Sequence, residues 1–572
     1  MATSETPADE PQQTSGGVRL LELITFGLGA VLIGLSLWVV IARLRYPIDA
    51  EWMTGAVRDG VDRIRDGKPL YSAPSARFVP FVYTPIYFWL AGTLAHVMST
   101  FIACKVVSFA ATLTTGWGIH CISRSLGASK RWAAIGVLLF AATYPLTLFF
   151  YDIERVDALS ASFVVVAVAL LVSRPAMLWS AIAGVLLGLA FFAKQPGVLA
   201  FAAAVAGLGF AGERRRALLV AGVGSLVFLA MFAYLEATTH GWFRYYCVKL
   251  PQAHGMRPEL FSTFFVLDMP KAFAMAAGSL AVVVPVAWSF LRRRRAPEGE
   301  SWQHLVFAFV LAAGMAGAFS LRAHLGGWAN VLVAWLPLGC AATAVAAARA
   351  EESARGTTAS ALVRVLMLGG VSLQLLGTIF DPNDNSPNAD DLAERQRFIA
   401  LVRKLEVDGD VLITTSGHVV KGSSVHAAAL FDVIRAGDRA PDDLLEGLEK
   451  RRYAALFVGA PDEFLCEKKT CLELVAMIER HYFVAGRRHE RSRNGMTGFD
   501  ARPRWVLRPR KAALPATSMK MLLLRQHIEM GLAETARARS PLDVEIVPQD
   551  EIEALADIQV DATQAASGPD LH

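Results

Sequence analysis

The sequence predicts an α-helical polytopic membrane protein followed by a C-terminal soluble α/β domain. Of the 572 residues, 54% are hydrophobic and 19% are charged, and the mean hydropathy is +0.40, above the range of soluble globular proteins. Apolar stretches of about 17–25 residues, enough to cross roughly 30 Å of hydrocarbon as helix, recur through residues 20–380. After residue 380 the sequence becomes polar and rich in turn residues, which indicates a separate domain.

Clusters of positive charge predict the orientation of these spans. The first apolar stretch, residues 20–42, is too long for the apolar part of a signal peptide, so we expect a retained anchor after a cytoplasmic tail of residues 1–19. Loops rich in Lys and Arg face the cytoplasm. Such loops lie at residues 124–131, 174, 214–216, 292–295 and 349–355. Because the positive charge clusters in these short loops, the net charge of +5 does not indicate a nucleic-acid partner.

One apolar stretch does not fit a simple count of crossings. Residues 81–97 and 101–122 both precede the basic loop at 124–131, and two crossings would place that loop outside. We therefore expect residues 81–97 to lie along the outer interface, where Tyr87 and Trp89 suit the headgroup level. About eleven spans then remain in the plasma (inner) membrane. The N-terminus is expected to be cytoplasmic and the C-terminal domain extracytoplasmic.

Two carboxylates, Asp49 and Glu51, follow the first span directly. Carboxylates close to hydrocarbon are costly and usually functional where they occur, although a pair in a loop can also be merely solvated. Apolar residues then recur at helical spacing over residues 53–64, with Arg58 among the charged residues between them. This pattern predicts an amphipathic helix that lies on the membrane with a solvated polar face. The alternative is that its basic residues help to hold an anionic lipid headgroup.

The loop between the spans near residues 150–157 is predicted to lie on the same side and is acidic. Asp152, Glu154 and Asp157 could bind sugar hydroxyls or a cation, and the alternative is that they only keep the loop soluble. The sequence does not require a metal. His324, in a later outer loop, is a further candidate sugar or cation ligand, or a structural hydrogen-bonding residue.

Lys194 is the leading candidate ligand for a phosphate. It separates two short apolar stretches, residues 177–193 and 197–211, and Pro196 follows it. Short segments interrupted by proline are places where polar groups line a cavity in a membrane protein. The alternative is that Lys194 reaches to lipid headgroups from a helix end. Arg155 and Arg322 are candidate additional phosphate ligands on the same face.

Several short motifs resemble one family. They are the Asp-x-Glu element at Asp49, Gly67-Lys-Pro-Leu-Tyr71, Tyr83-Thr-Pro-Ile-Tyr-Phe-Trp89, the acidic second loop, Lys194-Gln195 and Gly326-Gly-Trp-Ala-Asn330. With the topology, they resemble the GT-C superfamily of integral-membrane glycosyltransferases, in particular bacterial relatives of protein O-mannosyltransferases and of the aminoarabinose transferases of lipid A. The resemblance covers about residues 20–380 and implies a GT-C-like catalytic domain there.

The resemblance also implies a reaction. The donor would be a polyprenyl-phosphate sugar, and the acceptor a lipid, a polysaccharide or a protein on the extracytoplasmic face. Asp49, the first acid of its element, would be the base and Glu51 would support it. Independently of the family, glycosyl transfer needs a base for the acceptor hydroxyl and cations on the departing phosphate, which Asp49 or Glu51 and Lys194 could supply.

Two other classes of function are alternatives to a transferase. A transporter or lipid flippase could use a broken helix at Lys194. However, a transporter predicts polar residues along the midplane of several spans and two similar halves, whereas the acids here concentrate in loops. A membrane receptor or scaffold would leave Asp49 and Glu51 unexplained.

Residues 381–512 predict the soluble α/β domain, which we interpret as an accessory lid or an acceptor-docking module. We expect helices around 392–405, 425–434 and 472–480, and strands at 411–415, 453–458, 482–485 and 505–507. Cys466 and Cys471 predict a local disulfide in an oxidising compartment. His418 and His426 have poor spacing for a metal site. Residues 513–572 predict a charged helix and a polar tail that are exposed or disordered.

Overall fold

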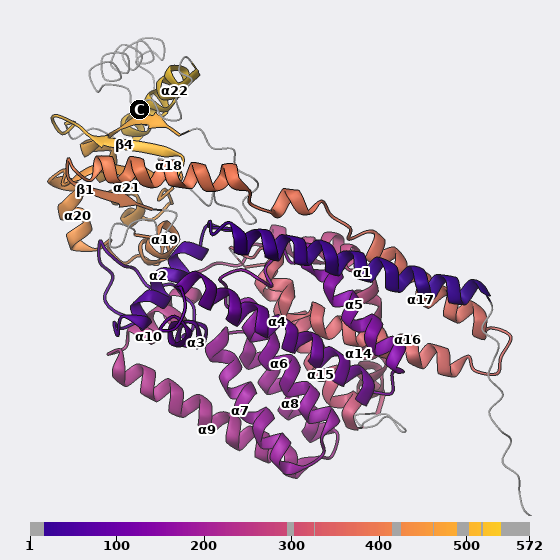
Figure 1. Ribbon diagram of the computed structural model, residues 1–572. Coiled ribbons are helices and arrows are strands. Elements are labelled where there is room, and N and C mark those ends of the chain that lie inside the picture. The colour runs from indigo at the N-terminus through magenta and orange to yellow at the C-terminus, as the bar shows by residue number, and fades with distance from the viewer. Residues whose placement is uncertain are drawn as a thin grey trace, which may run out of the picture.

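The structure, a computed structural model, describes residues 16–293, 302–324, 326–414, 425–460, 463–488, 503–515 and 519–538. A long helical bundle forms most of it, with a smaller domain at one end (Figure 1). The bundle contains eleven helices of 14 or more residues. They are α1 (Gly16–Arg45), α4 (Thr100–Ser125), α5 (Lys130–Leu146), α6 (Asp157–Ser173), α7 (Met177–Ala193), α8 (Gly197–Phe210), α9 (Arg214–Thr238), α14 (Phe273–Arg293), α15 (Trp302–Arg322), α16 (Leu336–Ser353) and α17 (Ser360–Leu376).

The bundle is that of a multi-pass membrane protein. Among the described residues, α1, α4, α9 and α15 are long and apolar enough to cross a membrane, and a bent pair, Pro258–Lys271 with Phe273–Trp288, would make a fifth crossing. Large apolar side chains such as Leu23 and Leu218 point outward and are 70% and 74% exposed. Apolar surface of this kind indicates a lipid environment. The count of eleven spans stays a prediction.

Small residues allow the helices to approach closely. On α7, Gly184 and Gly188 face α9, and a Cβ at Gly188 would lie 2.6 Å from the carbonyl oxygen of Gly224. This spacing of small residues at four-residue intervals is typical of helix contacts within membranes, because packing rather than the hydrophobic effect joins helices there.

Short elements separate or follow the long helices of the bundle. They are α2 (Thr54–Arg65), α3 (Ile86–Leu94), α10 (Trp242–Arg244), η1 (Tyr245–Lys249), α11 (Leu250–Gln252), η2 (Pro258–Leu260), α12 (Phe261–Thr263), η3 (Phe264–Asp268), α13 (Met269–Lys271), η4 (Ala329–Ala334) and η5 (Pro382–Asn385). The nine residues of α3 are too few to cross a bilayer, which needs about 20. This length agrees with the expectation that residues 81–97 do not cross, while their depth in a membrane stays a prediction.

The C-terminal domain is built around a four-stranded mixed sheet. Its strands are β1 (Asp410–Ile413), β2 (Tyr453–Val458), β3 (Tyr482–Arg487) and β4 (Trp505–Pro509), in the order β1-β2-β4-β3. Only β1 and β2 pair in parallel, with Val411 opposite Ala455, and β4 runs antiparallel to both neighbours. The helices are α18 (Ala389–Leu405), α19 (Ala427–Arg435), α20 (Asp442–Glu449) and α21 (Lys469–His481).

Alternating residues of the strands face two layers of helices. Val411, Ile413 and Phe457 pack with Phe398 and Val402 of α18 on one face. The intervening residues of the same strands belong to the core that contains α19 and α21. This alternation follows from the two-residue period of a strand. A capping box at Asn388 and Asp391 begins α18.

Cys466 and Cys471 form the predicted disulfide. The expected strands and helices of this domain appear within a few residues of their predicted ends, and α20 is an element that the sequence analysis missed. His418 lies outside the described residues.

The expectation of an exposed helix after residue 513 is wrong for the part that the structure describes. The helix α22 (Met519–Ala538) packs against β3. Its Glu529 is fully buried, pairs with Arg510 at 2.6 Å and accepts a hydrogen bond from the backbone N–H of Val484 at 3.0 Å. The charged residue that suggested an exposed helix is therefore a buried partner of the sheet edge. Residues 539–572, the predicted polar tail, lie outside the described residues.

Candidate active site

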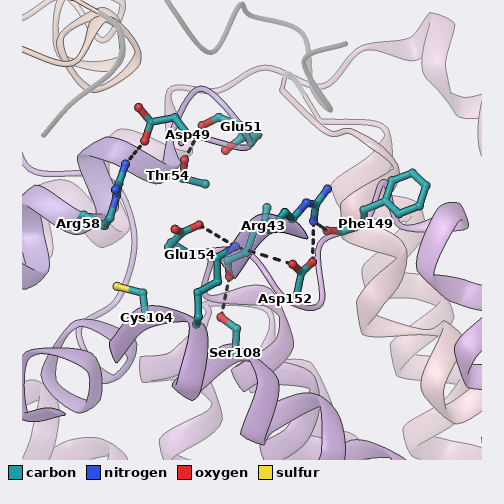
Figure 2. Close-up of polar contacts among 12 residues, drawn as sticks. Arg43, Asp49, Glu51, Thr54, Arg58, Cys104, Ser108, Phe149, Asp152 and Glu154 are labelled. Carbon is teal, nitrogen blue, oxygen red and sulfur yellow. Dashed lines mark hydrogen bonds and ion pairs between the residues drawn. The ribbon is translucent and has the colours of Figure 1, made fainter. Parts of the chain in front are cut away.

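Asp49 lies in the turn between α1 and α2 and is paired with two arginines. Arg58 of α2 reaches one carboxylate oxygen directly, and Arg395 of α18 lies 3.5 Å from the other. Figure 2 shows Arg58 pointing from its helix toward Asp49. The sequence analysis placed Arg58 on a solvated face, and this is wrong: only 2% of its surface is exposed. The reason is Asp49, because a buried carboxylate requires a nearby positive charge.

Glu51 has a different set of partners, although it lies two residues from Asp49. Its carboxylate accepts from Arg155 at 3.0 Å and from the backbone N–H of Met53 at 3.1 Å. The Thr54 hydroxyl donates to the Glu51 carbonyl at 2.7 Å, which closes the turn that begins α2. Arg155 also donates to Tyr83. Asp49 and Glu51 are thus fixed by different arginines.

The acids of the second loop surround a lysine. Asp152 accepts from Arg43 of α1 at 2.6 Å (Figure 2). It also accepts from the Tyr144 hydroxyl at 2.6 Å. Lys105 of α4 lies 3.8 Å from Asp152 and 3.5 Å from Glu154. Both carboxylate oxygens of Glu154 are buried without a hydrogen-bond partner among the described residues. Such unsatisfied buried groups are rare and mark strained or functional sites.

The backbone that leads into this loop is also unusual. Leu148 and Phe149 have φ angles of 56° and 60°, a left-handed conformation that non-glycine residues seldom adopt. The carbonyl of Phe149 accepts from Arg43 at 3.1 Å. Strained backbone of this kind persists where the surrounding contacts fix it, and it concentrates at functional sites.

Asp157 and Lys194 join the second loop to a break between helices. Lys194 directly follows α7 and precedes the start of α8, as the position of Pro196 suggested. Its ammonium donates to Asp157 at 2.6 Å, and Asn330 of η4 donates to the same oxygen at 3.1 Å. The Arg155 guanidinium lies 3.7 Å from the other oxygen of Asp157. The acids of both loops are therefore linked through Arg155.

An apolar crevice opens at Lys194. Asp157, Ser160, Lys194 and Asn330 provide its polar residues. The remaining walls are largely Ala, Val, Leu, Gly and Pro side chains from α6, α8, α15 and the segment around η4. A cation at the polar end of an apolar channel is suited to an anionic group carried on a hydrocarbon chain.

Arg322 and His324 belong to a different group of contacts. Arg322 pairs with Asp268 of η3 at 2.9 Å and donates to the carbonyl of Gly327 at 2.7 Å. The His324 ring lies 5.1 Å from that of His254, which pairs with Asp432 of α19 at 2.6 Å. The structure thus brings Lys194 and Arg155 together with the acids, and it pairs Arg322 with an acid outside both loops.

The described residues contain no group of three or more His, Cys, Asp or Glu side chains placed to hold a metal ion. Between Asp152 and Glu154 the positive charge is supplied by Lys105, and at Asp49 it is supplied by arginines. Cationic side chains therefore lie next to these acids.

Comparison with known proteins identifies the fold. The structure of ArnT from Cupriavidus metallidurans in the apo state is similar, with a TM-score of 0.52 and 12% sequence identity over 86% of this chain and 98% of that chain. The chain has a GT-C fold. No family model and no curated protein matches the sequence.

Two further structures of GT-C proteins are more distant. ArnT bound to undecaprenyl phosphate gives a TM-score of 0.48 at 12% identity, over 88% of this chain and 100% of that chain. The apo oligosaccharyltransferase from Archaeoglobus fulgidus gives 0.48 at 11% identity, over 79% and 73%. The similarity to the apo ArnT structure establishes the fold alone, and the activity must be argued from the site.

Four cations of the site were missed in the sequence analysis. They are Arg43, Arg58, Lys105 and Arg395. One signal was available for Lys105, because it is a charged residue inside an apolar stretch, where charges are rare and usually functional. Arg58 was considered only as part of the polar face of an amphipathic helix, and Arg43, at the end of the first apolar stretch, was not singled out.

Proposed function

We propose that this GT-C protein is a membrane glycosyltransferase that moves a sugar from a polyprenyl-phosphate donor to an acceptor hydroxyl on the extracytoplasmic face. The observation that carries the proposal is the series of ion pairs from Glu51, which lies two residues after Asp49, through Arg155 and Asp157 to Lys194, which lines an apolar crevice. It combines the two requirements of the reaction, a carboxylate base and a cation for the leaving phosphate.

The crevice supports a lipid-carried donor rather than a nucleotide sugar. Its apolar walls match a polyprenyl chain, and Lys194 is 15% exposed, so its ammonium is accessible to a phosphate while it holds Asp157. A phosphate there would share Lys194 with Asp157. Arg155 and Asn330 already contact Asp157 and would compensate the carboxylate during that exchange.

In the proposed reaction the acceptor oxygen forms a bond to the anomeric carbon as the bond from that carbon to the phosphate oxygen breaks. The electron pair leaves with the polyprenyl phosphate, whose charge Lys194 stabilises. The acceptor proton passes to Asp49, and Glu51 holds Arg155 and the start of α2 in place. Asp152 and Glu154 are assigned to the sugar hydroxyls, because neither carboxylate oxygen of Glu154 accepts a hydrogen bond from a described residue.

Asp49→Asn tests this proposal with the largest expected effect. The amide keeps the size of the carboxylate but cannot accept the acceptor proton, so transfer should fall about 10²–10⁴-fold. Transfer from a radiolabelled lipid-linked sugar pool in membranes of the overexpressing strain would measure it. Undecaprenyl phosphate binding should persist in this variant.

Glu51→Gln is the matched comparison. If Glu51→Gln is inactive while Asp49→Asn transfers normally, the two roles are exchanged. Wild-type transfer by both variants would contradict the proposed site altogether.

A lipid transporter is the second candidate, and the break between α7 and α8 at Lys194 favours it. A transporter needs no general base. The test is the movement of a fluorescent polyprenyl phosphate across the membrane of proteoliposomes. Movement that is unchanged in Asp49→Asn, together with no sugar transfer by the wild type, would favour the transporter.

A further inference from the structure

The C-terminal domain touches the Asp49 turn itself. Arg395 of α18 reaches the Asp49 carboxylate at 3.5 Å, and His426, which precedes α19, donates from Nε2 to the carbonyl oxygen of Trp52 at 2.7 Å. In Figure 1 the domain lies against the end of the bundle that carries α2 and α10. Residues more than 300 positions away in the sequence thus complete the environment of the candidate base.

The His426 ring makes both aromatic contacts and a hydrogen bond at this interface. The ring stacks on Trp52 at 5.4 Å and lies 4.9 Å from the ring of Phe81, and only 5% of the residue is exposed. A carbonyl can only accept, so Nε2 carries the proton. Nδ1 is buried without a hydrogen-bond partner among the described residues. The ring is therefore a donor to one backbone atom within an aromatic stack.

Other contacts hold the domain on the bundle without touching this turn. Asp443 of α20 accepts from the backbone N–H of Ala76 at 2.9 Å. Asp438 accepts from the Tyr245 hydroxyl at 2.8 Å, and Asp432 pairs with His254 at 2.6 Å. Docking therefore has several anchors, and the loss of one contact at the turn need not release the domain.

The turn has few constraints of its own. The Glu51 carbonyl accepts from the Thr54 backbone N–H at 3.1 Å and from its hydroxyl, and the Glu51 carboxylate accepts from the Met53 N–H. Trp52 is the residue between these two hydrogen-bonded groups, so the position of its carbonyl sets the direction of the peptide units on either side. Glu51 belongs to the first of these units, and Asp49 lies three residues before Trp52.

We propose that the C-terminal domain is part of the active site, with His426 and Arg395 as positioning residues that fix the turn at residues 49–52 and so direct the Asp49 and Glu51 carboxylates. The roles of those carboxylates rest on the proposed function, whereas the fixing of the turn does not. The domain is then more than a lid or an acceptor-docking module, because the orientation of the base depends on it.

The test uses the full chain in detergent and hydrogen–deuterium exchange of peptides that cover residues 46–66. His426→Phe keeps an aromatic ring on Trp52 but removes the donor, and His426→Gln keeps a donor but removes the ring. The N–H groups of Met53 and Thr54 should exchange about tenfold faster in His426→Phe and close to the wild-type rate in His426→Gln. Arg395→Met should also accelerate exchange in the turn.

Asp443→Ala is the control, because it removes a docking contact away from the turn. It should accelerate exchange near Ala76 and leave Met53 and Thr54 unchanged. Wild-type exchange at Met53 and Thr54 in both His426→Phe and Arg395→Met would overturn the inference. Equal acceleration there in Asp443→Ala would also overturn it, since general docking would then explain the effect.

Transfer kinetics separate positioning from a general loss of structure. His426→Phe should lower the rate at saturating donor at least about tenfold, while the binding of undecaprenyl phosphate stays at the wild-type level. A parallel loss of that binding would overturn the positioning role. Full transfer by both Asp49→Asn and Glu51→Gln would overturn the proposed function alone, because the exchange experiment needs neither donor nor acceptor.

Discussion

The two ends of α1 and α5 carry ion clusters built from the same residue types but in different environments. At one end, Arg131 pairs with Glu22 and Glu351, and Arg364 pairs with Glu351. We call these four residues the Arg131 cluster. At the other end lies the Asp49 cluster, which consists of Arg43, Asp49, Glu51, Arg58, Lys105, Asp152, Glu154, Arg155, Asp157, Lys194 and Arg395.

The burial of the side chains and the hydrogen bonding of the carboxylates distinguish the clusters. The side chains of the Arg131 cluster are 14–26% exposed, and Glu351 accepts from Arg131 and from the Trp132 ring N–H. In the Asp49 cluster, Glu51, Glu154 and Asp157 are 1–2% exposed, and oxygens of Glu154 and Asp157 lack hydrogen-bond partners among the described residues. The first arrangement ties helix ends together. The second maintains charge at a high energetic cost, which is expected where the charge is used.

The largest effect that tests this difference comes from removing one cation at each end. Lys105→Met leaves Glu154 buried without its nearest positive charge, which should destabilise the protein by about 3–5 kcal/mol. Arg131→Met removes a partly exposed cation and should cost about 1 kcal/mol or less. Thermal unfolding midpoints of both variants in the same detergent would show the contrast.

The double variant Lys105→Met/Glu154→Gln is the control for this experiment. It removes both charges, so it should recover much of the stability lost in Lys105→Met. Equal losses in Lys105→Met and Arg131→Met would show that the two clusters do not differ in kind.

The pH dependence of stability sharpens the comparison, because His426 contacts the turn of Asp49. Burial lowers the pKa of His426 to about 4, with Arg155 adding to the decrease, while the hydrogen bond to Trp52 and Asp432 oppose it. Exposed histidine has a pKa of about 6.5. Between about pH 6.5 and 4, His426 binds a proton in the unfolded or undocked state but not in the folded state. The stability contribution of neutral His426 is therefore full above about pH 6.5. It decreases by up to about 3 kcal/mol as the pH falls toward about 4.

The measurement compares the pH dependence of unfolding in the wild type and in His426→Gln. The glutamine does not titrate, so the slope between about pH 6.5 and 4 should be shallower in this variant, whatever its stability at pH 7. Identical slopes would show that His426 is not held neutral at the interface. Asp432 is present in both proteins and cancels in the comparison.

The fold could be predicted largely because its signals are local. Apolar stretches and strand alternation depend on neighbouring residues, and β2 was placed at its observed bounds. The short helix α20 was missed because eight residues give little periodicity. The packing of α22 could not be predicted, since its buried Glu529 is explained only by Arg510 and the edge of β3.

The site could be predicted only in part, for a related reason. Loop acids such as Asp49 and Asp152 are conspicuous next to apolar stretches, so they were found. Their partners come from distant elements: Arg43 and Asp152 are 109 positions apart. A sequence pattern does not contain that proximity. Lys105 was also missed, although the sequence contained a signal for it, because a charged residue inside an apolar stretch is unusual.

Substitution of Lys194 tests whether the Asp49 cluster binds an anion. We do not expect the Arg131 cluster to bind one. Lys194→Ala removes a charge-assisted contact to phosphate and should weaken undecaprenyl phosphate binding by about 10–100-fold. Lys194→Arg should recover part of the affinity, since it keeps the charge with a different shape. Competition with a labelled polyprenyl phosphate would measure both, with Arg131→Met as the control. Unchanged undecaprenyl phosphate binding in Lys194→Ala would show that Lys194 does not bind the phosphate and serves only as the partner of Asp157.

The smallest expected effect concerns which end of the bundle faces the oxidising compartment. The disulfide between Cys466 and Cys471 lies in the domain that packs over the Asp49 cluster, so its presence in cells would place that cluster on the extracytoplasmic side. Mass spectrometry of membranes alkylated without reductant should find the bond intact. Its loop is short, so replacing both cysteines with serine should cost at most about 2–3 kcal/mol. Free thiols at both positions would instead favour a cytoplasmic Asp49 cluster and contradict the proposed face of transfer.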